Sequence, residues 1–331
     1  MEGMDPTSAT AASSIAGHST ERVELVRFVR PFREADEYLG EFSFTQLHVE
    51  VARNATGDFN PFHDPVRWRQ VRNNRFGAPI VLGFQLEMLL AHAVMEQRLA
   101  EGDAGSDDGW PGRFVSFRFS FADAVRVGEP VEVEVKPTRQ GSRAGGTRTN
   151  RILLRKRGRP VVTGRVESLC ERPAGLELDF RPPAELFDLP DRSRLAGGRY
   201  FLKHRSLQIS DAKNFLAGSQ VVPCRYFDEL EGRARFPALF PLSLVSSALL
   251  EKAASEGYDF MERPLVYASH LFHVDLGWLK RLRDGELLHL LVEGPLNQAK
   301  EEVRSRYRCV GLLSRGRLLF TAEIGLAPLE R

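Results

Sequence analysis

An internal repeat limits the fold of this 331-residue chain more than any other feature of its sequence. Residues 75–83 align with residues 235–243, and each stretch begins with Arg-Phe and has Ala and Leu at matching places. Each is followed by a long apolar segment, residues 84–94 and 244–254, of the kind that forms a buried helix. A repeat of this length and spacing predicts two copies of one structural unit.

Strand patterns follow the apolar segment in both copies. Apolar and polar residues alternate there with period two, which is typical of half-buried antiparallel strands. These stretches are residues 113–121, 131–135, 149–155 and 161–169 in the first copy and 265–274, 285–293, 302–313 and 317–327 in the second. Before the first helix, weaker patterns predict strands at 23–29 and 38–44, a helix at 45–54 capped by Thr45, and a helical turn within 66–74. The predicted fold class is therefore α+β, with a long helix and an antiparallel sheet in each copy.

A loop in the first copy carries two proton-transfer groups. Its sequence is Ala55-Thr56-Gly57-Asp58-Phe59-Asn60-Pro61-Phe62-His63. Gly57 permits a left-handed backbone and Pro61 fixes one φ angle, so the stretch favours a rigid loop over a helix or strand. A carboxylate and an imidazole held by one loop are suited to acid–base catalysis.

The second candidate functional feature is the start of the long helix. The chain there reads Phe76-Gly77-Ala78-Pro79-Ile80-Val81-Leu82-Gly83. The first backbone N–H groups of a helix have no partner within the helix, and they lie at the positive end of its dipole. The helix start is therefore a candidate site for an oxyanion.

Together these two stretches resemble the MaoC-like family of (R)-specific enoyl-thioester hydratases and dehydratases. The family pattern is Gly-Asp-x-Asn-Pro-apolar-His, followed by Phe-Gly-x-Pro-Ile-apolar-x-Gly at the helix start. The chain departs from it at Asp64-Pro65, which follow His63 without the usual intervening residue, at Leu82, where the family often has His, and at Phe62, which is bulkier than usual.

The resemblance implies a fold and a set of roles. The expected fold is the hot dog, a curved antiparallel sheet wrapped round one long helix. Asp58 and His63 would be the acid–base pair, Asn60 a positioning hydrogen bonder, and the Gly83 amide the oxyanion donor. The substrate would be a 2-enoyl or 3-hydroxyacyl thioester of coenzyme A or acyl carrier protein. Which of Asp58 and His63 donates the proton stays open.

The repeat and the resemblance together predict a domain organisation. Residues 1–21 form a disordered tail, 22–172 a hot-dog domain with the active site, 173–198 a linker, and 199–331 a second hot-dog domain. In the second domain Ser219 and Cys224 stand where Asp58 and His63 stand in the first, so we expect it to be catalytically degenerate. The two domains should form an internal pseudo-dimer, and a homodimer of chains is a further possibility.

Composition excludes several other classes of protein. A formal net charge of +2 with scattered cations argues against a dedicated nucleic-acid binder. The three cysteines, Cys170, Cys224 and Cys309, lie far apart, so we expect neither a disulfide framework nor a metal site. No apolar run is long enough to cross a bilayer, and we expect a cytoplasmic protein whose only cofactor is the coenzyme A or phosphopantetheine of its substrate.

Four arginines follow the catalytic loop: Arg67, Arg69, Arg72 and Arg75. They are candidates for contact with the phosphates of coenzyme A or with an acidic carrier protein, and a solvated basic surface is an equally good interpretation.

Three functions remain open from the sequence. The first is hydration and dehydration of acyl thioesters in fatty acid or polyketide metabolism. The second is a hot-dog thioesterase, and the third is a non-catalytic acyl-binding or partner subunit. The small residues Ser246, Ser247 and Ala248 in the second helix predict either room for an acyl chain or close packing of the two helices.

Overall fold

The structure is a computed structural model that describes residues 32–34, 37–102, 110–141, 146–180, 182–296 and 304–329. The predicted tail and the predicted strand at 23–29 lie outside these residues.

The strands of the first half are β1 (Phe32–Glu34), β2 (Glu37–Ser43), β3 (Phe114–Phe121), β4 (Pro130–Val135), β5 (Arg139–Gln140), β6 (Arg148–Lys156) and β7 (Arg159–Leu169). The strands that follow are β8 (Arg194–Leu195), β9 (Tyr200–Leu207), β12 (Leu265–Asp275), β13 (Glu286–Glu293), β14 (Ser305–Leu313) and β15 (Arg317–Pro328), with a small hairpin of β10 (Phe227–Asp228) and β11 (Arg233–Ala234).

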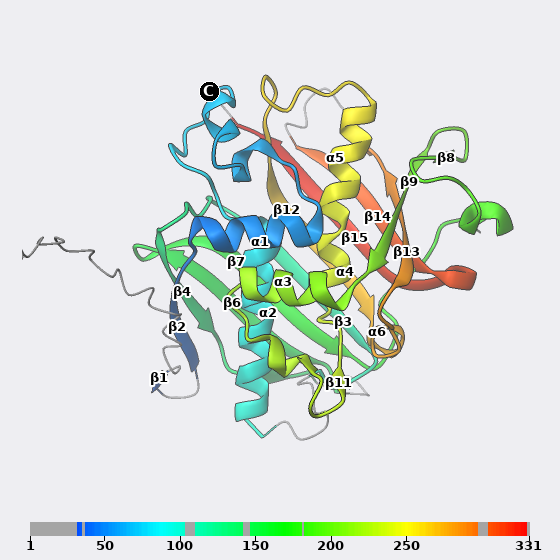
Figure 1. Ribbon diagram of the computed structural model, residues 1–331. Helices are drawn as coiled ribbons and strands as arrows, with labels where there is room; N and C mark the ends of the chain where they lie inside the picture. Colours follow the sequence, from blue (N-terminus) through cyan, green and yellow to red (C-terminus); the bar gives the residue numbers. More distant parts are fainter. Residues whose placement is uncertain are drawn as a thin grey trace, which may run out of the picture.

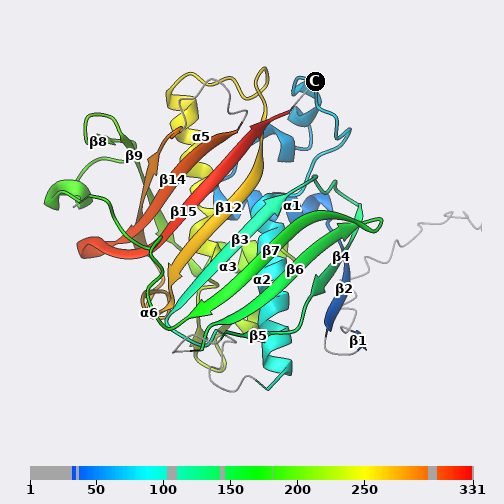
Figure 2. The ribbon, with the colours of Figure 1, turned by 180° about the vertical axis from the view of Figure 1, so that it is seen from behind.

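One antiparallel sheet runs through the whole molecule (Figure 2). Its order is β1-β2-β4-β6-β7-β3-β12-β15-β14-β13-β9-β8, with β5 paired to β6. The order β2-β4-β6-β7-β3 is mirrored by β9-β13-β14-β15-β12, so the two halves have the same topology. They are joined where β3 pairs with β12, from Phe114 opposite Asp275 to Ser120 opposite Ser269.

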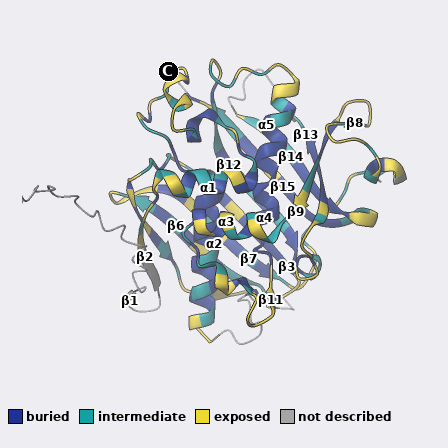
Figure 3. Ribbon diagram, viewed as in Figure 1, coloured by how far each residue is buried: buried dark blue, intermediate teal, exposed yellow. Residues whose placement is uncertain are grey.

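The helices lie on one face of this sheet (Figure 1). Helix α2 (Gly83–Ala100) lies along the first half, and α4 (Leu239–Ser243) with α5 (Val245–Ser255) along the second. Helices α1 (Gln46–Thr56) and α3 (Ile209–Gly218) lie side by side across them, and a short α6 (Leu276–Leu279) follows β12. Figure 3 shows that the central helices and the strands beneath them are largely buried. The predicted α+β class and the two repeated units are confirmed.

Close packing of α1 against α3 depends on Gly218. A Cβ atom at this position would lie 2.7 Å from the backbone oxygen of His48 and 2.9 Å from the Cβ of Ala52. Gln85 of α2 adds a polar link, because its Nε2 donates to the carbonyl oxygens of His48 at 3.0 Å and Gly218 at 2.7 Å. The two halves are therefore tied together by their helices as well as by the sheet.

The structure differs from the sequence-based expectation in three places. The second long helix begins earlier than expected, at Leu239, and has a break at Leu244 between α4 and α5. The segment 173–198 contains the short helix η3 (Ala184–Phe187) and strand β8, and it buries Leu176 and Leu186. Strand β9 and helix α3 were not anticipated, although Ala212, Phe215 and Leu216 have helical spacing and are buried.

No helix of the described residues is both long enough and apolar enough to cross a membrane.

Candidate active site

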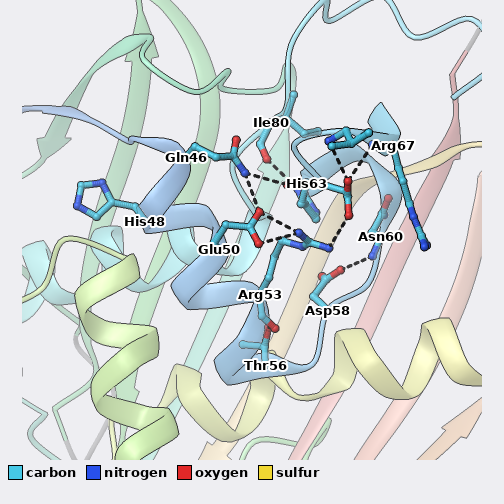
Figure 4. Close-up of polar contacts among 12 residues, drawn as sticks. Gln46, His48, Glu50, Arg53, Thr56, Asp58, Asn60, His63, Arg67 and Ile80 are labelled. Atoms are coloured by element: carbon cyan, nitrogen blue, oxygen red, sulfur yellow. Dashed lines mark hydrogen bonds and ion pairs between the residues drawn. The ribbon is translucent and has the colours of Figure 1, made fainter. Parts of the chain in front are cut away.

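The loop that carries Asp58 and His63 begins where α1 ends. Gly57 has a φ of 68° and closes α1 in the left-handed conformation, and its amide donates to the carbonyl of Arg53. Asp58 follows, and its Oδ1 accepts a hydrogen bond from the backbone amide of Asn60 at 2.8 Å (Figure 4). The Asn60 Oδ1 in turn accepts from the amide of Phe62 at 3.1 Å and caps the short helix η1 (Pro61–His63). Asn60 is therefore a helix cap within the loop, and its predicted role toward the substrate stays a prediction.

The loop and the helix-start motif form one unit. The amide of Ile80 donates to the carbonyl of Phe62 at 3.1 Å, and the carbonyl of Ile80 lies 2.8 Å from the Nδ1 of His63 (Figure 4). Because a carbonyl oxygen only accepts, Nδ1 carries the proton of the neutral ring, and Nε2 carries its lone pair. The second motif thus selects the tautomer of the histidine in the first.

Burial controls the charge of His63, whose exposed fraction is 4%. Burial lowers the pKa of His63 below its ordinary value of 6.5, while the negative charge of Asp58 acts in the opposite direction. The imidazole is therefore neutral near pH 7 and can accept a proton at Nε2.

A cavity of about 340 Å³ adjoins this pair and is lined by both halves of the chain. The first half contributes Asn60, Phe62, His63, Phe76, Gly83 and Phe121, and the second contributes Ser246, Leu249, Leu250, Tyr267 and Leu326. Most of this lining is apolar, and His63, Ser246 and Tyr267 are among its polar residues. The cavity can hold an apolar chain with its reactive end beside the imidazole.

Gly83 is the first residue of α2 and lies at the wall of the cavity. A Cβ atom there would lie 3.0 Å from Cδ2 of Tyr267 and 3.3 Å from the Phe121 ring. The absence of a side chain lets these two rings approach the helix start, and the role of the Gly83 amide as an oxyanion donor stays a prediction.

Two polar residues of the second half complete the surroundings of Asp58. The Oγ of Ser246, on α5, lies 2.5 Å from Oδ2 of Asp58, and the hydroxyl of Tyr267, on β12, lies 2.9 Å from Oγ of Ser246. Sequence analysis singled out Ser246 only for its small size and did not identify Tyr267. Ser246 and Asp58 are 188 positions apart in the chain, and no local sequence pattern indicates their contact.

Asp64 explains how the chain accommodates its departure from the family pattern. The Oδ1 of Asp64 accepts from the amides of Val66 at 2.9 Å and Arg67 at 2.8 Å, and its Oδ2 lies 3.4 Å from Arg53. Arg53 also pairs with Glu50 at 2.9 Å. Asp64 therefore ties the residues after His63 back to α1.

Of the four candidate arginines, the structure brings Arg75 to the cavity wall. Arg67 and Arg69 belong to the short helix η2 (Arg67–Gln70), where the Arg69 guanidinium lies 4.7 Å from the centre of the Trp68 ring. Arg72 pairs with Glu262 at 2.8 Å, and both side chains are more than half exposed. The cavity lining includes none of these three, and their contact with a phosphate or a carrier protein stays a prediction.

A second cavity, of about 320 Å³, occupies the corresponding place in the second repeat. It is lined by Arg235 and Phe236, which correspond to Arg75 and Phe76, and by Arg225, which is the third residue of the short helix η4 (Pro223–Arg225) as His63 is of η1. The residue after the cap of α3 is Gln220, so the structure shifts the sequence alignment at Ser219 and Cys224 by one position. Neither alignment places an Asp–His pair in the second repeat.

A buried polar pair links the two halves close to the site. Nδ1 of His270, on β12, lies 2.6 Å from Oε1 of Glu87, on α2, and both side chains are fully buried. Burial raises the pKa of Glu87, and the neighbouring His270 opposes this effect. The His270 ring also contacts Tyr267, with 4.4 Å between ring centres. His270 thus supports one wall of the cavity through its contact with Tyr267.

Several solved structures share this architecture over most of their length. A MaoC-like dehydratase superposes with a TM-score of 0.57 at 11% identity, and the match covers 88% of this chain and 97% of that one. A Mycobacterium tuberculosis protein described as having a double hotdog fold gives a TM-score of 0.56 at 10% identity, with 89% and 97% covered. The chain has a double hot-dog fold.

A further match is a full-length peroxisomal multifunctional enzyme type 2 from Drosophila melanogaster. Its TM-score is 0.52 at 11% identity, and the match covers 88% of this chain and 48% of that one. No protein-family model matches the sequence, and no curated protein matches it. At these identities the comparisons show the fold alone.

Proposed function

We propose that the chain catalyses the reversible hydration of 2-enoyl thioesters to 3-hydroxyacyl thioesters carried on coenzyme A or acyl carrier protein. The observation that carries this proposal is the state of His63. It is a buried, neutral imidazole with Nδ1 held by the Ile80 carbonyl, and it lies in the wall of a largely apolar cavity beside Asp58.

The proton steps follow from this state. In hydration, Nε2 of His63 takes a proton from water as the water oxygen forms a bond to Cβ of the substrate. The electron pair of the double bond moves toward the thioester carbonyl, whose oxygen becomes an enolate oxygen and accepts from the Gly83 amide at the positive end of α2. The imidazolium then returns the proton to Cα, and dehydration is the reverse sequence.

Asp58 has an electrostatic part in this scheme. An imidazolium in a buried site requires a compensating charge, and the Asp58 charge raises the pKa of His63 against the effect of burial. The carboxylate therefore stabilises the charged form of His63 that exists during the reaction. Several matched solved structures are described as MaoC-like dehydratases, which agrees with this proposal.

A panel of 2-enoyl-CoA esters of increasing chain length tests the proposal. We expect loss of the absorbance of the conjugated enoyl thioester and, by mass spectrometry, a product heavier by one water. Free coenzyme A with free acid as the main products would instead show a thioesterase. Binding of acyl-CoA without turnover of any ester would show a non-catalytic acyl-binding protein.

A further inference from the structure

The carboxylate of Asp58 is held by two donors from different halves of the chain. Oδ1 accepts the backbone amide of Asn60 at 2.8 Å, and Oδ2 accepts the hydroxyl of Ser246 at 2.5 Å. Both side chains are buried, with exposed fractions of 5% for Asp58 and 3% for Ser246. A buried carboxylate with both oxygens bonded has one fixed orientation.

Tyr267 helps to set which group donates in each hydrogen bond of the Tyr267–Ser246–Asp58 cluster. Burial raises the pKa of Tyr267 well above its ordinary range, so its hydroxyl keeps its proton. That hydroxyl lies 2.9 Å from Oγ of Ser246 and donates to it. The proton of Ser246 is then directed at Asp58, because a carboxylate only accepts.

Neighbouring Ser247 shows that this bond is specific to one position of α5. Its hydroxyl is equally buried but lies 2.9 Å from the carbonyl oxygen of Leu244, in the preceding turn of its own helix. Ser246 and Tyr267 line the cavity together with His63, whereas Asp58 is not among the described residues that line it. The second repeat thus supplies the groups that lie between Asp58 and the cavity.

We propose that Ser246 and Tyr267 are positioning residues for the hydration reaction, holding the Asp58 carboxylate in the one orientation from which its charge acts on His63. The active site is therefore composite, and the repeat that lacks an acid–base pair is required for the activity of the other repeat. This inference rests on the proposed function for its kinetic test. The charged groups that act on His63 are Asp58, Arg53 and Glu50, and the substitutions below leave the last two in place.

The first test is kinetic and uses the full chain with the short 2-enoyl-CoA ester that it turns over best. Loss of a hydrogen bond to a charged group predicts that Ser246→Ala lowers kcat by about 10- to 100-fold, and loss of a neutral donor predicts about 3- to 10-fold for Tyr267→Phe. KM should change little, because neither hydroxyl needs to bind the substrate. Ser246→Thr, which keeps the hydroxyl, should restore most of the rate.

A double substitution and a matched control sharpen this test. Because Tyr267 acts through Ser246, the Ser246→Ala/Tyr267→Phe protein should be no slower than Ser246→Ala alone. Ser247→Ala removes a neighbouring buried hydroxyl and should keep the parent rate. An unchanged kcat for Ser246→Ala overturns the proposal, as does an equal loss for Ser247→Ala with no rescue by threonine.

The second test does not depend on turnover. The titration of His63 followed by NMR in the parent, Ser246→Ala and Ser247→Ala proteins reports the field of Asp58 directly. Since the Asp58 charge raises the pKa of His63, a less ordered carboxylate should lower that pKa in Ser246→Ala and leave it unchanged in Ser247→Ala. If no enoyl thioester is turned over but this shift appears, the proposed function fails and the positioning role stands. If turnover is present and both readouts are unchanged, the positioning role fails alone.

Discussion

At the scale of single residues, the site depends on hydrogen bonds that fix protonation states. Nδ1 of His63 is bonded to the carbonyl of Ile80, which lies 17 positions later in the chain. Asp58 is fixed by Asn60 and Ser246, and Asp64 anchors the chain that follows. These bonds hold the side chains of Asp58 and His63 in one arrangement. We expect substitutions of these two residues to affect the reaction more than the fold.

His63→Ala should lower hydration by about 10²–10⁴-fold, the range typical for the loss of a proton-transfer partner. Asp58→Asn removes the charge that stabilises the His63 imidazolium and should also lower the rate. Thermal unfolding of both proteins should stay close to that of the parent. His48→Ala, at a partly buried histidine on α1, is the control and should keep the parent rate. Activity near the parent level in either site variant would show that the reaction uses other groups.

The rate should depend on pH through His63, which has to be neutral to take a proton from water. Because its pKa is lowered, protonation and loss of kcat/KM on acidification should occur below pH 6.5, the ordinary histidine value. A pH–rate profile with a short enoyl-CoA measures this directly. An acidic limb centred above pH 7 would mean that His63 is not the group that titrates.

At the scale of elements, the start of α2 is the part of the fold that the chemistry needs most. The helix begins at Gly83, directly after the segment that binds Phe62 and His63, and Tyr267 and Phe121 pack against that glycine. Its backbone therefore connects the imidazole, the cavity wall and the helix dipole within a few residues.

Gly83→Ala should impair catalysis with little loss of stability. The added Cβ would lie 3.0 Å from the Tyr267 ring and 3.3 Å from Phe121, so both rings have to move away from the helix start. We expect kcat to fall by at least about 10-fold, since even small misplacement of catalytic groups is costly. Initial rates together with a melting curve test this, and an unchanged kcat would show that the Tyr267 and Phe121 rings yield to the added Cβ without displacing the helix start.

At the scale of the whole molecule, the two repeats form one body. The sheet is continuous through the β3–β12 pair, α1 packs on α3, and the cavity has walls from both halves. Domain boundaries predicted from the sequence do not mark independent units in this arrangement, and we expect calorimetry to record a single unfolding transition.

Gly218→Ala should destabilise this body at the contact between α1 and α3. The new Cβ would lie 2.7 Å from a backbone oxygen, which cannot move as a side chain can, and overpacking of this kind costs about 1–3 kcal/mol. This exceeds the gain of up to about 1 kcal/mol from replacing glycine within a helix. Chemical denaturation measures the change, with the exposed neighbour substitution Ala217→Leu as the control that should be nearly neutral.

The sequence by itself determined the repeated units and the chemical groups of the first one. Period-two strands, an apolar helix in each copy and the repeat around Phe76 and Phe236 reflect local patterns that survive in the fold. Thr45 capping and the position of Gly57 were also readable, because caps and turns depend on neighbours only a few residues away.

Only the tertiary structure decided how the site is completed. Helix α3 and strand β9 gave weak local signals, and their places follow from the packing of the two repeats. The bond from Ser246 to Asp58 joins residues 188 positions apart, and it exists because the pseudo-dimer brings α5 of one repeat to the catalytic loop of the other. The sequence around a helical serine does not indicate contact with a distant carboxylate. The Ser246–Asp58 bond therefore follows from the packing of the two repeats alone.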